Sequence, residues 1–331
     1  MVETMLLDPF KRKINYLRIS VTDRCNLRCG YCMPEEGIPL IRHDDILTYE
    51  EILRIVRVFA IEGISKVRLT GGEPLVRKGI AKFISRLSQV EELKDLSLTT
   101  NGVLLKEFAA PLKQAGLKRV NISLDSLKRE RFHQITHRDE FDRVWAGIEE
   151  ALRVGLTPIK INMVAIQGLN DDEIEDFARM TLDLPVTVRY IEYMPSGNGK
   201  TWKKSDLLTI PQIKSRLEKV GPLVCITSEP WDGPAKRYRL EGAMGEIGLI
   251  GAVSSHFCSD CNRIRLTPDG KIRTCLFSDD EIDVRELLRK GGSDDDLKER
   301  LLEALRSKPE GHQIDTHQFK KCQRNMSAIG G

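Results

Sequence analysis

Short runs of apolar and β-branched residues alternate with amphipathic stretches along the first two thirds of the chain. An apolar run of about 4–8 residues predicts a strand, whereas apolar residues spaced three or four apart predict a helix. The predicted strands are Tyr16–Val21, Lys66–Thr70, Asp95–Thr100, Arg119–Leu124, Pro158–Val164 and Val186–Tyr193.

Capping residues mark the ends of the predicted helices. Thr48 and Glu51 form a capping-box pattern at a helix start. Glycines stand where helices should end, at Gly63, Gly116, Gly155 and Gly221. Alternating strands and helices imply a parallel sheet with right-handed crossovers. Six strand–helix units are too few for a closed eightfold barrel, so the predicted fold is α/β, an open, partial (β/α)6 TIM-type barrel with one wall missing.

The pattern changes near residue 229. Pro230–Pro234 has the composition of a turn-rich linker. Strand-like and helical segments follow it, at Arg237–Leu240, Glu246–Val253, Val284–Arg289 and Asp296–Arg306. We therefore predict two domains, a barrel over residues 1–228 and a carboxyl-terminal α+β extension over residues 229–331 that fills the missing wall.

Composition narrows the class of protein. The chain has 331 residues, 31% of them charged, with a net charge of +3, which disfavours a nucleic-acid binder that relies on bulk electrostatics. Residues 1–16 lack the apolar core of a signal peptide, and no run of about 18 apolar residues occurs. We expect a soluble, cytoplasmic protein without a nucleic-acid or membrane partner. Its eight cysteines are better metal ligands than disulfide partners in such a compartment.

Three cysteines, Cys25, Cys29 and Cys32, form what we call the first triad. They follow the predicted strand at Tyr16–Val21, at the carboxyl end where α/β folds place their chemistry. Three soft thiolates without a local fourth ligand favour an iron-sulfur cluster with one open iron. A zinc site completed by His43, or thiols without a shared role, are the alternatives at this point.

Cys258, Cys261 and Cys275 form the second triad. A zinc ribbon completed by His256 or by a distant cysteine is an alternative interpretation. Arg263 and Arg265 stand between its cysteines, an arrangement that suits an anion better than a purely structural metal knot.

The spacing of the first triad, with Tyr31 before the last cysteine, resembles the radical S-adenosylmethionine superfamily. Both triads together resemble the GTP 3′,8-cyclase family of molybdenum-cofactor biosynthesis. The resemblance covers nearly the whole chain and is carried by Leu17–Cys25, Val67–Leu75, Leu98–Gly102, Asn121–Leu127, Cys258–Arg265 and Met326–Gly331.

The resemblance implies two 4Fe-4S clusters, one on each triad, with S-adenosylmethionine bound at the first and guanine at the second. S-Adenosylmethionine contacts are implied at Tyr31, Gly72, Ser123 and Met194. GTP contacts are implied at Arg18, Arg68, Thr99, Lys160, Arg189, Arg263, Ile264 and Arg265. The terminal Gly330 and Gly331 are implied to reach into the active site as an essential tail, and no further catalytic side chain is implied.

Each of these residues also has an ordinary interpretation. A Gly-Gly pair is usually a tight turn, a charged residue on a barrel strand is usually solvated on the exterior, and terminal glycines are usually frayed. No Walker-type phosphate loop occurs in the sequence.

The activity implied by the resemblance is that of a lyase. It converts GTP to (8S)-3′,8-cyclo-7,8-dihydro-GTP, with a 5′-deoxyadenosyl radical abstracting the ribose 3′ hydrogen, as the first step of molybdenum-cofactor biosynthesis. The implied partners are an electron donor such as flavodoxin or ferredoxin, the next enzyme (cyclic pyranopterin monophosphate synthase), and a second copy in a homodimer. A radical enzyme acting on a peptide or a tRNA base, and a non-enzymatic zinc protein, are the rivals.

Overall fold

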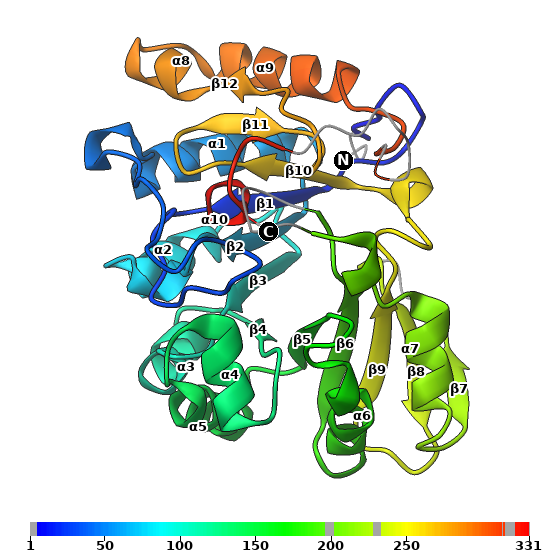
Figure 1. The fold of residues 1–331 in the computed structure, drawn as a ribbon. Helices are drawn as coiled ribbons and strands as arrows, with labels where there is room; N and C mark the ends of the chain where they lie inside the picture. Colours follow the sequence, from blue (N-terminus) through cyan, green and yellow to red (C-terminus); the bar gives the residue numbers. More distant parts are fainter. Residues whose placement is uncertain (1–4, 196–201, 228–232, 313, 315–321, 331) are drawn as a thin grey trace.

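The computed structural model describes residues 5–195, 202–227, 233–312, 314 and 322–330. Within them, twelve strands form one continuous sheet (Figure 1). In chain order the strands are β1 Tyr16–Ser20, β2 Lys66–Thr70, β3 Asp95–Thr100, β4 Arg119–Ser123, β5 Ile159–Ala165, β6 Val186–Glu192, β7 Leu223–Ile226, β8 Lys236–Leu240, β9 Glu246–Ile250, β10 Arg263–Leu266, β11 Lys271–Arg273 and β12 Ile282–Asp283.

The α-helices connect the strands or follow them. Their bounds are α1 Tyr49–Ile61, α2 Ile80–Leu87, α3 Leu105–Gln114, α4 Arg129–Thr136, α5 Phe141–Arg153, α6 Ile174–Asp183, α7 Ile210–Leu217, α8 Arg285–Arg289, α9 Asp294–Arg306 and α10 Met326–Ile329. Short 3-10 turns lie at His43–Asp45, Pro74–Val76, Asp171–Glu173, Lys204–Asp206 and Cys258–Asp260. No described helix is both long and apolar enough to cross a membrane.

The sheet order is β12-β11-β10-β1-β2-β3-β4-β5-β6-β9-β8-β7. The stretch from β10 to β9 is parallel throughout, and β11, β12, β8 and β7 are antiparallel additions at its two ends. The predicted α/β partial barrel is confirmed. The late part of the chain completes it at both edges, because β10 pairs with β1 and β9 pairs with β6.

Most of the helix signals in the sequence are also borne out, but Gly221 stands four positions after the last residue of α7 and has no positive φ. Thr48 and Glu51 form a reciprocal capping box at the start of α1. Gly63, Gly116 and Gly155 follow α1, α3 and α5 with positive φ angles of 120°, 92° and 72°, a backbone region that glycine enters without strain.

The core lies between the sheet and its outer helices. Strand β5 shows the division, because Ile159, Ile161 and Met163 are fully buried while the alternate residues on its other face are partly exposed. That other face lines the interior of the barrel. The predicted domain boundary at residues 228 and 229 stays a prediction, since β7 before it and β8 after it are paired in the same sheet.

Candidate active site

The first triad lies in the loop that follows β1. The loop turns tightly, because the N–H groups of Cys32 and Met33 both donate to the Cys29 carbonyl, at 2.8 and 3.0 Å. The turn after β2 supports it from the side, since Gly72 N–H donates to the Thr22 carbonyl at 2.7 Å. A Cβ on Gly72 would stand 2.3 Å from the Arg24 carbonyl oxygen. Gly72 is therefore required for this close packing, apart from any contact with a ligand.

Glu73 ties the ends of β2 and β3 together. Its carboxylate accepts from Thr100 Oγ1 at 2.7 Å and from the N–H groups of Asn101 and Leu75 at 2.6 and 3.0 Å. Burial outweighs these hydrogen bonds and raises the pKa of Glu73 to about 7. Glu73 is thus a buried support at the base of the turn that contacts the triad loop.

The second triad is held where β9 leads into β10 and where β11 ends. Lys308, only 3% exposed, donates from Nζ to the Arg263 and Thr274 carbonyls at 3.0 and 2.8 Å and lies 3.5 Å from Cys261 Sγ. Although burial opposes it, the positive charges of Arg263 and Lys308 lower the pKa of Cys261 to about 7. This environment favours a thiolate at Cys261.

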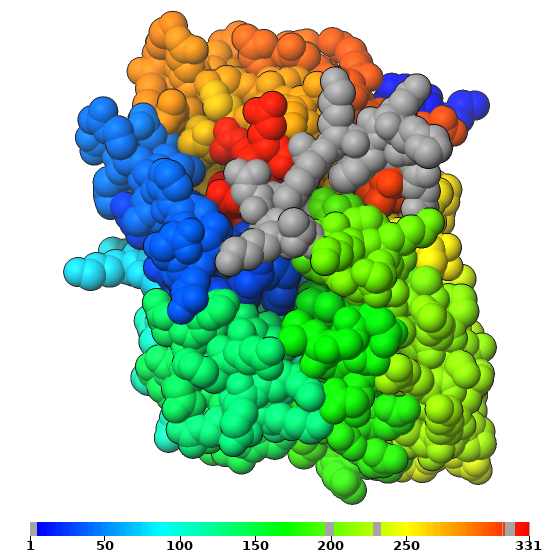
Figure 2. Space-filling view, viewed as in Figure 1, coloured from blue at the N-terminus to red at the C-terminus, as the bar shows by residue number. Residues whose placement is uncertain are grey.

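Both triads face one cavity of about 320 Å³. The structure brings to this cavity all six triad cysteines and ten other predicted site residues, namely Arg18, Tyr31, Arg68, Gly72, Thr99, Ser123, Met194, Arg189, Arg263 and Arg265. In the space-filling view, the red tail residues near 330 lie between the blue amino-terminal segments and the orange part of the extension (Figure 2).

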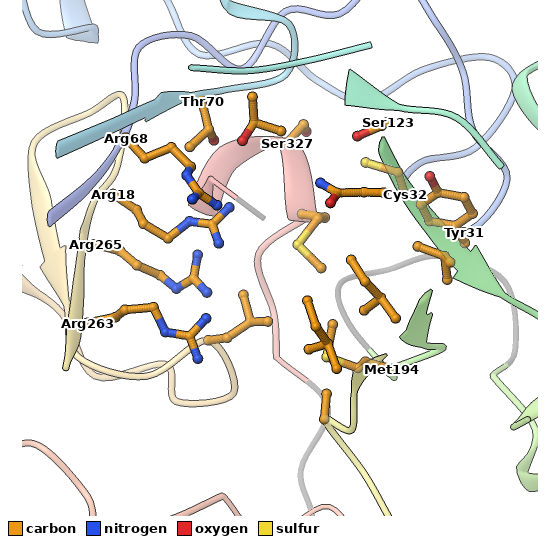
Figure 3. Close-up of a pocket in the computed structure, with 18 of the residues that line it drawn as sticks. Arg18, Tyr31, Cys32, Arg68, Thr70, Ser123, Met194, Arg263, Arg265 and Ser327 are labelled. Carbon is orange, nitrogen blue, oxygen red and sulfur yellow. The ribbon is translucent and has the colours of Figure 1, made fainter. Parts of the chain in front are cut away.

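Arginines from three neighbouring strands line one wall of the cavity (Figure 3). Arg18 on β1 is in register with Arg68 on β2 and with Arg265 on β10. Burial, together with repulsion from Arg263, lowers the pKa of Arg265 to about 10, and burial also lowers the pKa of Arg68 and Arg18. Like charges in register on adjacent strands destabilise a sheet. This wall therefore suits a ligand that carries several negative charges.

Arg189 extends the positive surface from β6. Its Nε donates to Asn162 Oδ1 at 2.9 Å and a terminal nitrogen donates to Asn121 Oδ1 at 2.7 Å, which fixes the guanidinium plane. Burial, followed by repulsion from Arg68, lowers the pKa of Arg189 to about 9. A Cβ on Gly248 would stand 2.9 Å from Arg189 Cγ, so glycine on β9 leaves room for this side chain.

Tyr31, Ser123 and Met194 lie across the cavity from the arginine wall (Figure 3). Tyr31 O–H donates to Asp125 Oδ2 at 2.7 Å, and the N–H of Val164 donates to Asp125 Oδ1 at 2.8 Å. Asp125 thus links the first triad loop to β5. The cavity has a cationic side and a side formed by the triad loop and the ends of β4 to β6.

The donor set fits an iron-sulfur cluster at the first triad. Burial raises the pKa of Cys25 to about 11 and of Cys32 to about 12, and it also raises the pKa of Cys29 well above its ordinary value. Three thiolates so placed require a cationic centre next to them. Within the described residues, no three Cys, His, Asp or Glu side chains are spaced to hold a single metal ion.

Buried hydroxyls point to a further ligand. Thr70 Oγ1, Thr99 Oγ1 and Ser327 Oγ are buried and have no hydrogen-bond partner among the described residues, and all three residues line the cavity. Buried polar groups are usually satisfied, and unsatisfied ones are common where a ligand binds.

Three predicted residues do not line the cavity. Lys160 is on the same face of β5 as Asn162 and Val164, which line the cavity, but it is two residues nearer the amino end of the strand than Asn162. Ile264 alternates with Arg263 and Arg265, so its side chain is fully buried in the core. Gly330 contacts the wall from the tail, since Arg265 donates to its carbonyl at 2.6 Å, whereas Gly331 is outside the described residues.

Sequence reasoning assigned no role to Lys308 or Asp125, which support the two triads. Lys308 follows a helix more than thirty residues after Cys275, and nothing in its neighbourhood signals a buried amine. Asp125 had a usable signal, because it follows a strand end in the Ser-Leu-Asp segment, at the edge where parallel strands place their site residues.

Two family profiles match the chain. Residues 19–181 match the Radical SAM superfamily, and residues 186–314 match Molybdenum Cofactor Synthesis C. The GTP 3′,8-cyclase of Alkaliphilus metalliredigens is 49% identical over 324 residues, covering 98% of this chain and 99% of that protein. The GTP 3′,8-cyclase of Thermodesulfovibrio yellowstonii is 50% identical over 326 residues, with coverage of 98% and 99%.

Solved structures resemble the fold. SuiB of Streptococcus suis bound to S-adenosylmethionine is 18% identical, with a TM-score of 0.59, and the match covers 95% of this chain and 77% of that one. SuiB bound to its precursor peptide SuiA matches with 18% identity, a TM-score of 0.60, and coverage of 95% and 76%. At this identity the likeness concerns the fold alone.

Proposed function

This chain belongs to the GTP 3′,8-cyclase family, and on that premise we propose that it converts GTP to (8S)-3′,8-cyclo-7,8-dihydro-GTP. The reaction is the first step of molybdenum-cofactor biosynthesis and makes the chain a radical S-adenosylmethionine lyase. One observation carries the proposal: two cysteine triads face the same cavity as a wall of in-register arginines.

The first triad would hold the 4Fe-4S cluster that binds S-adenosylmethionine. Tyr31, Gly72, Ser123 and Met194, at the side of the cavity away from the arginines, are its proposed contacts. When bound, the cluster and S-adenosylmethionine supply a 5′-deoxyadenosyl radical that removes the ribose 3′ hydrogen. The protein's part is to orient the ribose toward that side and to keep the site enclosed.

The arginine wall would bind the triphosphate. GTP brings about four negative charges at neutral pH, and guanidinium forks bind phosphate oxygens in pairs. Arg18, Arg68, Arg263 and Arg265 line the wall, and Arg189 adds a fifth charge. Binding would relieve their mutual repulsion and would give the Thr99 hydroxyl a partner.

Lys160 and Ile264 remain proposed GTP contacts, although neither is among the residues that line the cavity. Lys160 would reach the ligand only from the amino end of β5, and Ile264 would contribute its backbone, because its side chain is in the core.

The second triad would hold a second 4Fe-4S cluster whose open iron binds guanine. With the base held there and the phosphates on the arginine wall, the ribose is left in reach of the first triad. Gly330 and Gly331 would complete the site as a tail, a role that the contact between Arg265 and the Gly330 carbonyl supports.

The remaining proposals concern the enzyme's protein partners, its oligomeric state and its location in the cell. Each turnover would consume two electrons from a small redox protein such as flavodoxin or ferredoxin. One would serve the cleavage of S-adenosylmethionine and the other, together with a proton, would complete the 7,8-dihydro product. The product would pass to cyclic pyranopterin monophosphate synthase. We propose a cytoplasmic homodimer.

An isotope experiment tests the function. The anaerobically purified chain should carry about eight irons and eight sulfides. With S-adenosylmethionine, a reductant and GTP deuterated at the ribose 3′ carbon, it should form the cyclised product and deuterated 5′-deoxyadenosine. GTP deuterated at the 2′ carbon is the matched control and should yield unlabelled 5′-deoxyadenosine. Two zinc ions per chain with no iron after reconstitution, or no deuterium transfer from either position, would overturn the proposal.

A further inference from the structure

In the described part of the tail, residues 322–330, Arg324 makes more ion pairs than any other residue. Two of its nitrogens donate to the two carboxylate oxygens of Asp269, each at 2.9 Å. The same side chain reaches Glu281, with distances of 2.7 Å from the terminal nitrogen to Oε2 and 2.6 Å from Nε to Oε1. The three side chains are only 16–23% exposed. Two carboxylates that accept hydrogen bonds from one guanidinium in this way fix its position and orientation.

The two carboxylates belong to the part of the fold that carries the second triad. Asp269 lies in the turn between β10 and β11, and Glu281 immediately precedes β12. Glu281 also pairs with Arg273, which is fully buried and stands two residues before Cys275. The ion-pair cluster therefore joins the tail to the loop that holds Cys275.

The tail beyond Arg324 is short and closely fitted. Asn325 immediately precedes the single turn of α10, whose Met326 and Ser327 line the cavity. Gly330 has a φ of 68°, and a Cβ there would stand 3.0 Å from Thr70 Oγ1. Its carbonyl accepts from Arg265 at 2.6 Å. Only five residues separate Arg324 from Gly330, so a slip by one residue at Arg324 would move Gly330 away from Arg265.

We propose that Arg324 is a positioning residue, which anchors the tail through Asp269 and Glu281 so that the Gly330 carbonyl meets Arg265 at the arginine wall. Asp269 and Arg265 are on the same β10–β11 hairpin, so the anchor and its target move as one unit. Arg324 itself does not line the cavity. Its proposed importance for turnover rests on the proposed function, but its anchoring of the tail does not.

The test compares three variants in the cluster-loaded, full-length protein under anaerobic conditions. Arg324→Gln keeps a polar side chain and removes the charge, and Arg324→Lys keeps the charge and removes the fork. Arg300→Gln is the matched control, because Arg300 is an arginine of the same extension whose Glu303 ion pair is exposed. The readouts are amide hydrogen exchange over residues 322–330, iron content, and the kcat and KM of each substrate.

Arg324→Gln should speed exchange in the tail at least tenfold, for example at Ala328, whose N–H donates to the Asn325 carbonyl at 3.0 Å. It should lower kcat at least tenfold while leaving the iron content and the KM for S-adenosylmethionine unchanged. Arg324→Lys should fall between the parent and Arg324→Gln, because one ammonium cannot fork to both carboxylates. Arg300→Gln should match the parent protein.

Unchanged exchange in the tail of Arg324→Gln would overturn the proposal, even if turnover fell. Faster exchange with full turnover would overturn the link to catalysis. If Arg324→Gln lost iron, Asp269→Asn would be measured in its place, and slow exchange in that variant would count against the anchor. A parent protein that failed to cyclise GTP would refute the proposed function, and the exchange comparison would still decide the anchor.

Discussion

Replacing Arg18 should strengthen the fold and weaken nucleotide binding at once. Arg18 stands in register between Arg68 and Arg265, so it experiences repulsion from both sides. Arg18→Met keeps the length and apolar stem of the side chain and removes the charge. If the wall is built for an anion, the unliganded protein carries this repulsion as a cost in stability.

The size of the effect follows from the spacing of strands. Two unit charges one strand apart, about 4.8 Å, repel by about 3.5 kcal/mol at an effective dielectric constant of about 20. The side chains diverge and the cavity admits water, so we reduce this to about 1 kcal/mol for each neighbour. Removing Arg18 should therefore stabilise the unliganded protein by about 2 kcal/mol. Losing one charged partner of the triphosphate should weaken GTP binding by about 1.5–3 kcal/mol, or about 10- to 150-fold in Kd.

Urea unfolding and isothermal titration with GTP measure the two effects. Urea is uncharged and leaves the repulsion unscreened, and the buffer should lack phosphate and sulfate, which would occupy the wall. Arg300→Met, at an exposed site, should change neither quantity by more than about 0.5 kcal/mol. The reasoning would be refuted if Arg18→Met were less stable than the parent and bound GTP equally well, because the arginine row would then be structural.

Three further predictions concern other parts of the site. Alanine at all three positions of the first triad should leave about four irons per chain by metal analysis and abolish S-adenosylmethionine cleavage; eight irons would contradict the assignment. Deleting residues 330–331 should leave iron content and the melting temperature nearly unchanged but remove most cyclisation, and full turnover would mean that the tail is a frayed end. Burial raises the pKa of Glu73 from its ordinary 4.5 to about 7. Between these pH values the folded state keeps a proton that the unfolded state has lost, so the free energy of unfolding falls as pH rises from 4.5 to 7. Glu73→Gln should reduce that fall by roughly 1–3 kcal/mol in unfolding measurements across this range, and an equally steep decline would refute the assignment.

The barrel strands could be predicted because each is a distinct apolar run. The predicted runs at residues 66–70 and 95–100 match β2 and β3 at both ends, and the run at 16–21 exceeds β1 by one residue. Strands β10, β11 and β12 were not predicted, since they have only two to four residues and β10 contains two arginines. The pairing of β10 also depends on β1, far away in the sequence, which local periodicity does not record.

The site was predictable where spacing or a motif carries it. The triads and the strand-end residues are visible as patterns, and the cavity unites them. Lys160 and Ile264 show what the linear sequence omits, because register and alternation decide which side chain of a strand faces the cavity. The partners of Arg324 lie 55 and 43 residues away in the sequence, so no local pattern could reveal its pairing.

The position of β1 in the sheet has a consequence for how the protein is made. Strand β1 leaves the ribosome about 240 residues before its partner β10. At roughly 5–20 residues per second, β1 waits about 12–50 s with one edge unpaired. An open strand edge is a hazard for association with other chains during that time. Synthesis should therefore be the period when this protein depends most on chaperones, and the second triad is complete only after Cys275 has been made.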